Sequence, residues 1–229
     1  MGRTLPTALL GEIVGYLDIT LDVFLPRYEK IWEKNSRIEK IIEDGTVKWH
    51  VNGLAHSLHD RPAVIWNDGI QEWFCRGQMH RGHDRPAQVY PNDGTKGWAK
   101  MGMIHRNGGK PAIERVFGNG CVQREWWIMD KLHREDDEPA IETTNGTKKW
   151  YWNNQLHRDG DLSAVEHPNG NKEWWIHGLR HRDHGRPAIY RLLTKNHEWW
   201  VNGVEQPEPR ARLKRRRGAS KLLRTSPMS

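Results

Sequence analysis

Hydrophobic and polar residues along this chain follow a pattern that returns about every 25 residues. Each unit contains one anchor tryptophan, and these stand at Trp49, Trp73, Trp98, Trp126, Trp150, Trp174 and Trp199. In the first six units a histidine follows the anchor by seven residues, and proline (serine once) and then alanine follow that histidine by six and seven. Such a regular return of one motif indicates a repeat protein.

Each unit has the pattern of two short β-strands. One strand begins at Pro-Ala, and a turn rich in asparagine, aspartate and glycine follows it, as at Asn145 and Gly146. Asn-Gly pairs predict a type I′ hairpin turn. The second strand carries the anchor tryptophan and closes at another turn, such as that of Asn52 and Gly53. The fold class is therefore mainly β, an elongated antiparallel β-hairpin repeat array, and its sheet should twist.

The two ends of the chain differ from the repeats. Residues 36–45 resemble a trailing half-unit with its turn at Asp44 and Gly45, so the array should start near residue 37. Before it, apolar residues at helical spacing after Pro6 predict a small helical cap. The expected domains are a cap at 1–36, β-hairpin repeats at 37–207 and an extended tail at 208–229.

Alternation along a strand assigns the aromatic residues to two faces. The anchor tryptophan and the residue two positions later should share one face, and the residue directly after the anchor should point to the other. We expect this second stripe to bind a partner, and its residues are Phe74, Trp127, Tyr151, Trp175 and Trp200.

The net charge of +7 belongs to the tail and not to the repeats. Residues 208–229 contain eight basic residues and one acid, so the rest of the chain is neutral. The basic arm comprises Arg210, Arg212, Lys214, Arg215, Arg216 and Arg217. Such an arm is suited to nucleic acid, to an acidic protein surface or to a nuclear signal. The neutral repeats argue against a nucleic-acid-binding face.

The histidines do not form a predicted metal or catalytic site. Equivalent positions in successive hairpins lie about 9–10 Å apart, too far to share a zinc ion. Every His, Arg and Asp also recurs at the same repeat position, whereas an active site needs one unrepeated constellation. We therefore expect no catalytic residues, no metal and no cofactor. Each His-Arg pair should instead bond turn carbonyls and the acidic residue before proline, namely Asp60, Asp84, Asp137 or Asp161.

No stretch of the sequence has the length and hydrophobicity of a membrane span, and no secretory signal is evident. The two cysteines, Cys75 and Cys121, are not arranged in a C-x-x-C pair, which is typical of proteins from a reducing compartment. We expect an intracellular protein without a membrane partner.

The units resemble MORN-type repeats, as residues 44–56 show with the pattern D-G-x-x-x-W-x-x-N-G-x-x-H. With H-R-x4-P-A after the histidine, they are similar to repeat proteins of large nucleocytoplasmic DNA viruses. The N-terminal segment resembles an F-box, the motif that docks onto the adaptor of cullin-type ubiquitin ligases. On that resemblance the adaptor would contact Leu5, Pro6, Leu10, Ile13 and Leu17.

Two functions of different class follow from these observations. The first is a non-catalytic scaffold that binds proteins, such as capsid proteins, within a large viral assembly in the virion or the host cytoplasm. The alternative is an F-box-type substrate receptor that recruits a ubiquitin ligase and captures a target on the repeat face. The sequence favours the first, because the basic tail has no role in the second.

Overall fold

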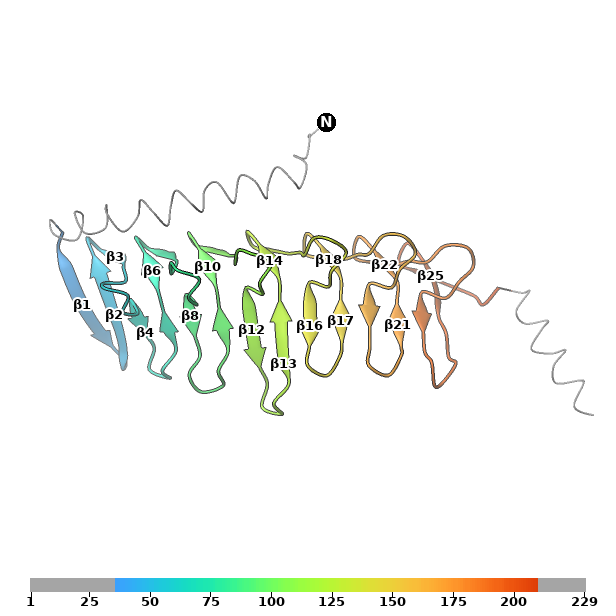
Figure 1. The fold of residues 1–229 in the computed structure, drawn as a ribbon, viewed down its shortest axis with the longest axis horizontal. Helices are drawn as coiled ribbons and strands as arrows, with labels where there is room; N and C mark the ends of the chain where they lie inside the picture. Colours follow the sequence, from blue (N-terminus) through green and yellow to red (C-terminus); the bar gives the residue numbers. More distant parts are fainter. Residues whose placement is uncertain (1–35, 210–229) are drawn as a thin grey trace, which may run out of the picture. The chain divides into compact units, whose positions relative to one another are not determined.

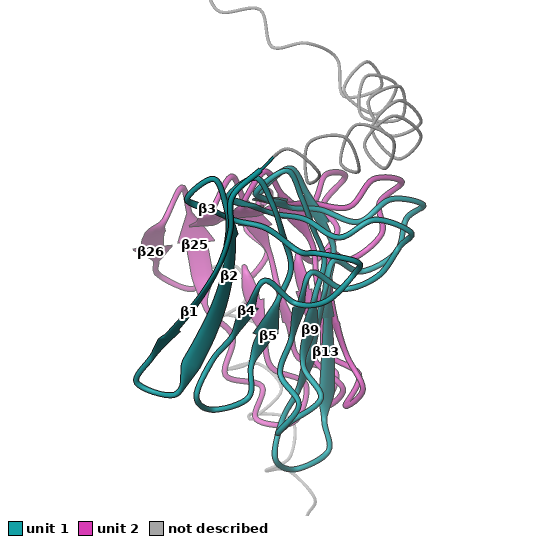
Figure 2. Ribbon diagram, turned by 90° about the vertical axis from the view of Figure 1, so that its left-hand side faces the viewer, with its two compact units in different colours: residues 1–131 teal, residues 132–229 magenta. Residues whose placement is uncertain are grey.

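The computed structural model describes residues 36–209, and within them the chain forms β-strands and turns without a helix. The expected helical cap, the five adaptor-docking positions and the basic arm lie outside the described residues. The chain divides into two compact units, residues 1–131 and 132–229 (Figure 2). The confirmed part of the expectation is an antiparallel hairpin architecture built along a long sheet (Figure 1).

In each unit the strands of one set pair side by side with their neighbours, and we call this set the ladder. In the first unit the ladder comprises β1 (Ile38–Glu43), β2 (Thr46–Val51), β4 (Val64–Ile65), β5 (Gln71–Glu72), β8 (Gln88–Val89), β9 (Lys96–Gly97), β12 (Ile113–Val116) and β13 (Val122–Glu125). In the second unit it comprises β16 (Ile141–Thr143), β17 (Lys148–Lys149), β20 (Val165–Glu166), β21 (Lys172–Glu173) and β24 (Ile189–Tyr190).

A second set of strands forms small hairpins outside the ladder. They are β6 (Phe74–Cys75) with β7 (Gln78–Met79), β10 (Ala99–Lys100) with β11 (Met103–Ile104), β14 (Trp127–Ile128) with β15 (Lys131–Leu132), β18 (Tyr151–Trp152) with β19 (Gln155–Leu156), β22 (Trp175–Ile176) with β23 (Leu179–Arg180), and β25 (Trp199–Val201) with β26 (Val204–Gln206). In the first repeat, β3 (Leu54–Ala55) pairs directly with β2.

The anchor tryptophan is the junction between the ladder and the small hairpin. The Trp73 amide donates to the Ala87 carbonyl on the ladder side, while the Trp73 carbonyl accepts from the His80 amide at the end of the hairpin. The strand therefore breaks at the tryptophan in the second to the sixth repeat, whereas β2 runs through Trp49 and β25 begins at Trp199. The expected face shared with the residue two positions later is not kept throughout, since Trp150 is buried but Trp152 is exposed. That expectation was wrong, because it assumed one unbroken strand.

Except in the first, the turns at the far end of the ladder hairpins are not of type I′; in the turn between β1 and β2, Asp44 (48°) and Gly45 (78°) both have positive φ. In the turn of residues 66–70 only Gly69 has a positive φ, and the Gly69 amide donates to the Trp66 carbonyl. This is a type I turn followed by a glycine bulge. The residue before the glycine also caps the turn, since Asp68 accepts a hydrogen bond from the Ile70 amide at 3.1 Å. The type I′ prediction was wrong here because Asp-Gly and Asn-Gly suit both turns.

Type I′ geometry occurs instead in the small hairpins. Both central residues have positive φ, as in Asn52 (52°) with Gly53 (78°) and His177 (46°) with Gly178 (79°). The second of these residues links neighbouring hairpins, because the Gly178 amide donates to the Leu156 carbonyl at 2.9 Å. Each hairpin is thereby fixed to the one before it.

Where the repeat has asparagine in place of that glycine, the side chain adds a second link. Asn154 adopts φ 71°, its amide donates to the Leu132 carbonyl at 3.1 Å, and its Oδ1 accepts from the Leu132 amide at 2.7 Å. Asparagine tolerates the left-handed region better than most residues do. This explains why glycine, aspartate and asparagine alternate at one repeat position.

The core lies where the two sets of strands meet. The alanine of each Pro-Ala or Ser-Ala pair is fully buried beside the anchor tryptophan, which is itself buried from the second repeat onward. These alanines are Ala63, Ala87, Ala112, Ala140, Ala164 and Ala188. A larger side chain at such a position would have to displace packed neighbours, so the invariance of alanine along the array has a steric cause.

We predict that Asn154→Ala lowers the free energy of unfolding by about 2–3 kcal/mol. Alanine would lose the hydrogen bond to Leu132 and would be strained at positive φ. Asn154→Gly should cost only about 1 kcal/mol, since glycine accepts this backbone. Urea denaturation followed by tryptophan fluorescence measures both. Equal losses in the two variants would contradict this account of the turn.

Candidate functional site

The anchor tryptophans hold the loop that precedes each Pro-Ala or Ser-Ala pair. The indole Nε1 of Trp73 donates to the carbonyl oxygen of Asp60 at 3.0 Å, and the same bond recurs in the later repeats. The acceptors are Asp84 for Trp98, Gly109 for Trp126, Asp137 for Trp150, Asp161 for Trp174 and Gly185 for Trp199, at 2.7–3.1 Å. Each acceptor has a positive φ, which explains why only aspartate and glycine stand there.

The arginine after each repeat histidine joins two successive repeats. Arg81 donates from Nε and Nη2 to both carboxylate oxygens of Asp60, at 2.8 and 2.9 Å, and from Nη1 to the Pro86 carbonyl at 3.2 Å. Its guanidinium carbon lies 3.8 Å from the ring centre of Trp73. We call this combination of aspartate, arginine and tryptophan the clasp. It pairs a bidentate salt bridge with a cation–π contact.

The clasp recurs with little change in geometry. Its other members are Asp84, Arg106 and Trp98; Asp137, Arg158 and Trp150; and Asp161, Arg182 and Trp174. The prediction that the arginine bonds both the acidic residue before proline and a carbonyl is confirmed. The acid and the tryptophan belong to neighbouring repeats, so the contact is one that strand periodicity alone does not indicate.

A second cation reaches the aspartate in several clasps. Arg85 contacts Asp60, Lys110 contacts Asp84 at 2.6 Å, and Arg186 contacts Asp161 at 2.5 Å. The hydrogen bonds from Arg106 lower the pKa of Asp84 to about 2, with further lowering from Lys110, against the opposing effect of burial. A carboxylate with so low a pKa is a weak base, so the clasp is poorly suited to proton transfer near neutral pH.

Two of the six loops lack the clasp carboxylate, because glycine stands at positions 109 and 185 where the others have aspartate. After the first of these loops, Arg134 instead approaches Glu142 at 3.4 Å and Glu138 at 3.7 Å. Arg134 still donates to the Pro139 carbonyl at 3.2 Å. The indole of Trp126 still donates to the Gly109 carbonyl, so the bond from tryptophan to loop is kept here although the aspartate is not.

Three repeat histidines, His56, His157 and His181, accept a hydrogen bond from a backbone amide of the next hairpin turn. The Nδ1 atom of His56 accepts a hydrogen bond from the Arg76 amide at 3.1 Å, and the Nδ1 atom of His181 accepts one from the Asn202 amide, also at 3.1 Å. On the other side of the ring, Nε2 of His181 lies 3.2 Å from Asp183. The expectation that these histidines bond turn carbonyls was wrong for these three rings. A neutral imidazole offers one acceptor, and the free amides of a type I′ turn supply its donor.

The five residues expected to bind a partner open the small hairpins and are half-buried. Phe74 and Trp127 lie in the first unit, and Tyr151, Trp175 and Trp200 lie in the second. Three of them donate their indole N–H to the glutamate that precedes the anchor tryptophan. The pairs are Trp127 with Glu125, Trp175 with Glu173 and Trp200 with Glu198, at 2.9–3.2 Å. The sequence signal for this bond, the triplet Glu-Trp-Trp, was overlooked.

These glutamates are bound on their other oxygen as well. Oε1 of Glu125 accepts from Arg115 at 2.6 Å, and Oε1 of Glu198 accepts from Arg191 at 2.6 Å. In the second unit the guanidinium of Arg180 lies 5.0 Å from the ring centre of Trp175 and 5.2 Å from that of Trp200. We call Trp175, Arg180 and Trp200 the aromatic patch.

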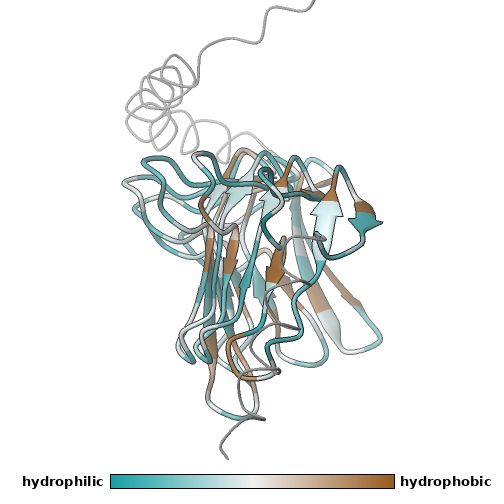
Figure 3. Cartoon of the chain, turned by 90° about the vertical axis from the view of Figure 1, so that its right-hand side faces the viewer, coloured by the Kyte–Doolittle hydropathy of each residue, from teal (hydrophilic) through white to brown (hydrophobic). Residues whose placement is uncertain are grey.

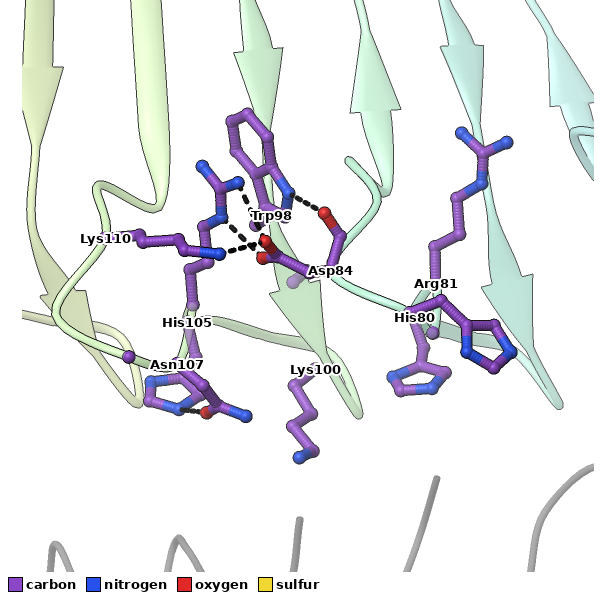
Figure 4. A pocket seen from close by; sticks show the side chains of 13 residues that line it. His80, Arg81, Asp84, Trp98, Lys100, His105, Asn107 and Lys110 are labelled. Atoms are coloured by element: carbon purple, nitrogen blue, oxygen red, sulfur yellow. Dashed lines mark hydrogen bonds and ion pairs between the residues drawn. The ribbon is translucent and has the colours of Figure 1, made fainter. Parts of the chain in front are cut away.

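Beside the clasps, equivalent grooves differ mainly in charge. The groove of about 250 Å³ around Trp98 is lined by four cationic residues and one acid, a formal charge of +3 (Figure 4). The groove of about 340 Å³ around Trp150 has two cationic residues and five acids, a charge of −3. The groove of about 360 Å³ around Trp174 has three cationic residues and two acids, a charge of +1.

Comparison with known proteins gives no matching family model, and no curated protein matches the chain significantly. The resemblance to MORN-type repeats and to viral repeat proteins therefore stays a prediction. Among residues 36–209 the structure places no group of three or more His, Cys, Asp or Glu side chains in an arrangement that could hold a metal ion. That part of the chain also contains no helix that could cross a membrane.

We predict that stability falls as the pH is lowered from about 4 to about 2. The clasp lowers the folded-state pKa of Asp84 from 3.8 to about 2, so its contribution is present above the unfolded value and is lost as pH drops through the folded one. Asp84→Asn should be less stable at pH 7 and should show a shallower loss in this window. Thermal denaturation followed by circular dichroism measures both effects.

The matched control is Asp68→Asn, at an exposed turn position where later repeats have asparagine. It should keep the wild-type pH profile. An Asp84→Asn profile as steep as that of the wild type would show that the clasp does not cause the acid sensitivity.

Proposed function

We propose that this protein is a non-catalytic scaffold that binds protein partners through its repeats. The observation that carries the proposal is that one part of each repeat stays the same along the array while the surface beside it varies. The clasp is nearly constant, whereas the charge of the groove beside it changes from +3 to −3 to +1. A constant framework with variable surfaces is typical of repeat proteins that bind other proteins.

The polar residues of the framework support a structural role. In the four complete clasps the aspartate and arginine are bound to each other, to backbone carbonyls and to tryptophan. Catalysis requires a group that is poised to exchange protons or attack a substrate. Carboxylates held ionised by arginine are suited instead to fixing one repeat upon the next.

The aromatic patch is the surface best suited to a protein partner. Tryptophan and arginine are the residue types most enriched among those that dominate binding energy. Trp175 and Trp200 are half-buried, and their bonds to Glu173 and Glu198 fix the rings before a partner arrives. Side chains that are already ordered lose little entropy on binding.

Assembly into a virion is part of this proposal and is supported by the resemblance to viral repeat proteins. The alternative, a substrate receptor for a ubiquitin ligase, depends on positions within residues 1–35. Those residues lie outside the described part of the chain, and no observation on residues 36–209 favours the alternative.

We predict that Trp175→Ala weakens capture of the native partner at least about tenfold, as expected for truncation of a central aromatic contact. Affinity purification of the tagged full chain from its native source, with quantitative mass spectrometry, should show one protein at fixed stoichiometry. Trp66→Ala is the control, because Trp66 is an exposed tryptophan in a ladder turn of the first unit and is not a member of the patch.

Both variants should first be shown to unfold like the wild type. Equal partner capture by wild type and Trp175→Ala would contradict the aromatic patch as the binding surface. The absence of any stoichiometric protein partner would contradict the scaffold itself.

A further inference from the structure

The third complete repeat departs from the others at two adjacent positions. Directly after the anchor Trp98 it has Ala99, where the other repeats have aromatic residues, histidine included. Next comes Lys100, where every other repeat has an apolar residue. Those residues are Val51, Cys75, Ile128, Trp152, Ile176 and Val201. Within this chain, therefore, one repeat exchanges two packing side chains for a small residue and a cation.

The exchange creates the cationic groove of the first unit. Ala99 and Lys100 both line it, together with Trp98, His80 and His105. Figure 4 shows the Lys100 side chain lying between the imidazoles of His80 and His105, on a different side of the strand from Asp84. Both histidines are buried, whereas Lys100 is half-buried.

The groove has a net positive charge because its cationic residues outnumber its one acid, and that acid is already bound to two of them. Asp84 is the acidic residue of the lining, and it accepts from Arg106 and Lys110 at 2.6–3.1 Å. Arg81 is held in the same way by Asp60 of the preceding repeat. Burial of Lys100 disfavours its charge and lowers its pKa. A lysine at this position is thus a cost to folding that the apolar residues of the other repeats avoid.

We propose that this groove binds an acidic segment of a partner protein, with a carboxylate bound by the ammonium group of Lys100. The charge of +3 is complementary to such a segment, and about 250 Å³ is room for a side chain and not for a nucleic-acid duplex. The inference deepens the proposed scaffold function by naming the chemistry of one partner. It rests on that function only in assuming that the ligand is a protein.

The test is binding of a short fluorescein-labelled poly-glutamate peptide, measured by fluorescence anisotropy at fixed low ionic strength. It uses the full chain with the basic arm neutralised by glutamine at Arg210, Arg212, Lys214, Arg215, Arg216 and Arg217, because that arm would itself bind the peptide. This arm-neutral chain is the wild-type reference for the variants below. Wild-type protein should bind this peptide, and a poly-lysine peptide of the same length should not bind. Lys100→Ile, which restores the pattern of the other repeats, should lower affinity at least about tenfold through loss of a charge-assisted hydrogen bond. Lys100→Gln should do the same.

Two controls separate binding from folding and from overall charge. Lys100→Ile should unfold at the same temperature as the wild type or higher, because it removes a half-buried cation. Lys96→Ala removes the same charge at an exposed ladder position in the same repeat and should leave peptide affinity within about twofold, as for a screened surface charge.

Several outcomes would overturn the proposal. They are no peptide binding by the wild type, an affinity in both Lys100 variants that is unchanged from the wild type, or inorganic phosphate competing as well as the peptide does, which would indicate a site for small oxyanions. Self-association that depends on Lys100 would identify a second copy of the chain as the occupant. Loss of peptide binding with Trp175-dependent partner capture intact would leave the aromatic patch unaffected, so the two proposals fail separately.

Discussion

The bond between an anchor tryptophan and the loop of the preceding repeat is the interaction on which the rest of the structure depends. It fixes a loop residue at positive φ, and that residue in turn presents its carboxylate to the next arginine, as Asp161 does to Arg182. The arginine then covers the face of the same tryptophan, 3.6 Å from the ring centre for Trp174. One indole thus organises a loop, an ion pair and a cation–π contact, all at the border between repeats.

This arrangement explains why so many charged residues are compatible with a thin core. The interior of the described repeats is built of tryptophan, alanine and histidine together with single aliphatic residues, several of them at the start of ladder strands, such as Val64, Val165 and Ile189. Small residues allow the ladder and the small hairpins to approach each other, and the hydrogen-bonding edges of tryptophan and histidine satisfy backbone groups that a purely aliphatic core would leave unpaired. The clasp arginines cover the outer side of the same indoles.

Much of this organisation follows from residue spacing. The constant distances from tryptophan to histidine and to Pro-Ala predicted the repeat, its hairpins and the first strand near residue 37, as the start of β1 at Ile38 shows. The pairing of arginine with the acid before proline also followed, because both recur together. The break in the strand at the anchor tryptophan of the second to the sixth repeat did not follow. Alternation of polar and apolar residues is the same for one bent strand and for two short ones, and only tertiary hydrogen bonds distinguish them.

The site was predictable to a lesser degree. The five residues expected to bind a partner are half-buried, and their role stays a prediction. The bond from such a residue to the preceding glutamate requires a bend that periodicity does not encode, as between Trp175 and Glu173. The groove at Lys100 was not predicted either, because the repeat pattern is defined by the residues that the units share, and Lys100 stands where one unit differs from the rest. Lys100 is visible in the sequence only when the repeats are compared with each other.

The clasp has an evolutionary consequence. Each ion pair joins residues 21 or 22 positions apart, about one repeat, as in Arg158 with Asp137 and Arg106 with Asp84. Duplication or deletion of one whole repeat by recombination would therefore leave every remaining arginine opposite an equivalent loop. The array can therefore gain or lose one repeat at a time without any change in the fold of the remaining repeats. A new copy would begin with the groove of its parent and could then acquire a different charge by substitution at a few loop positions.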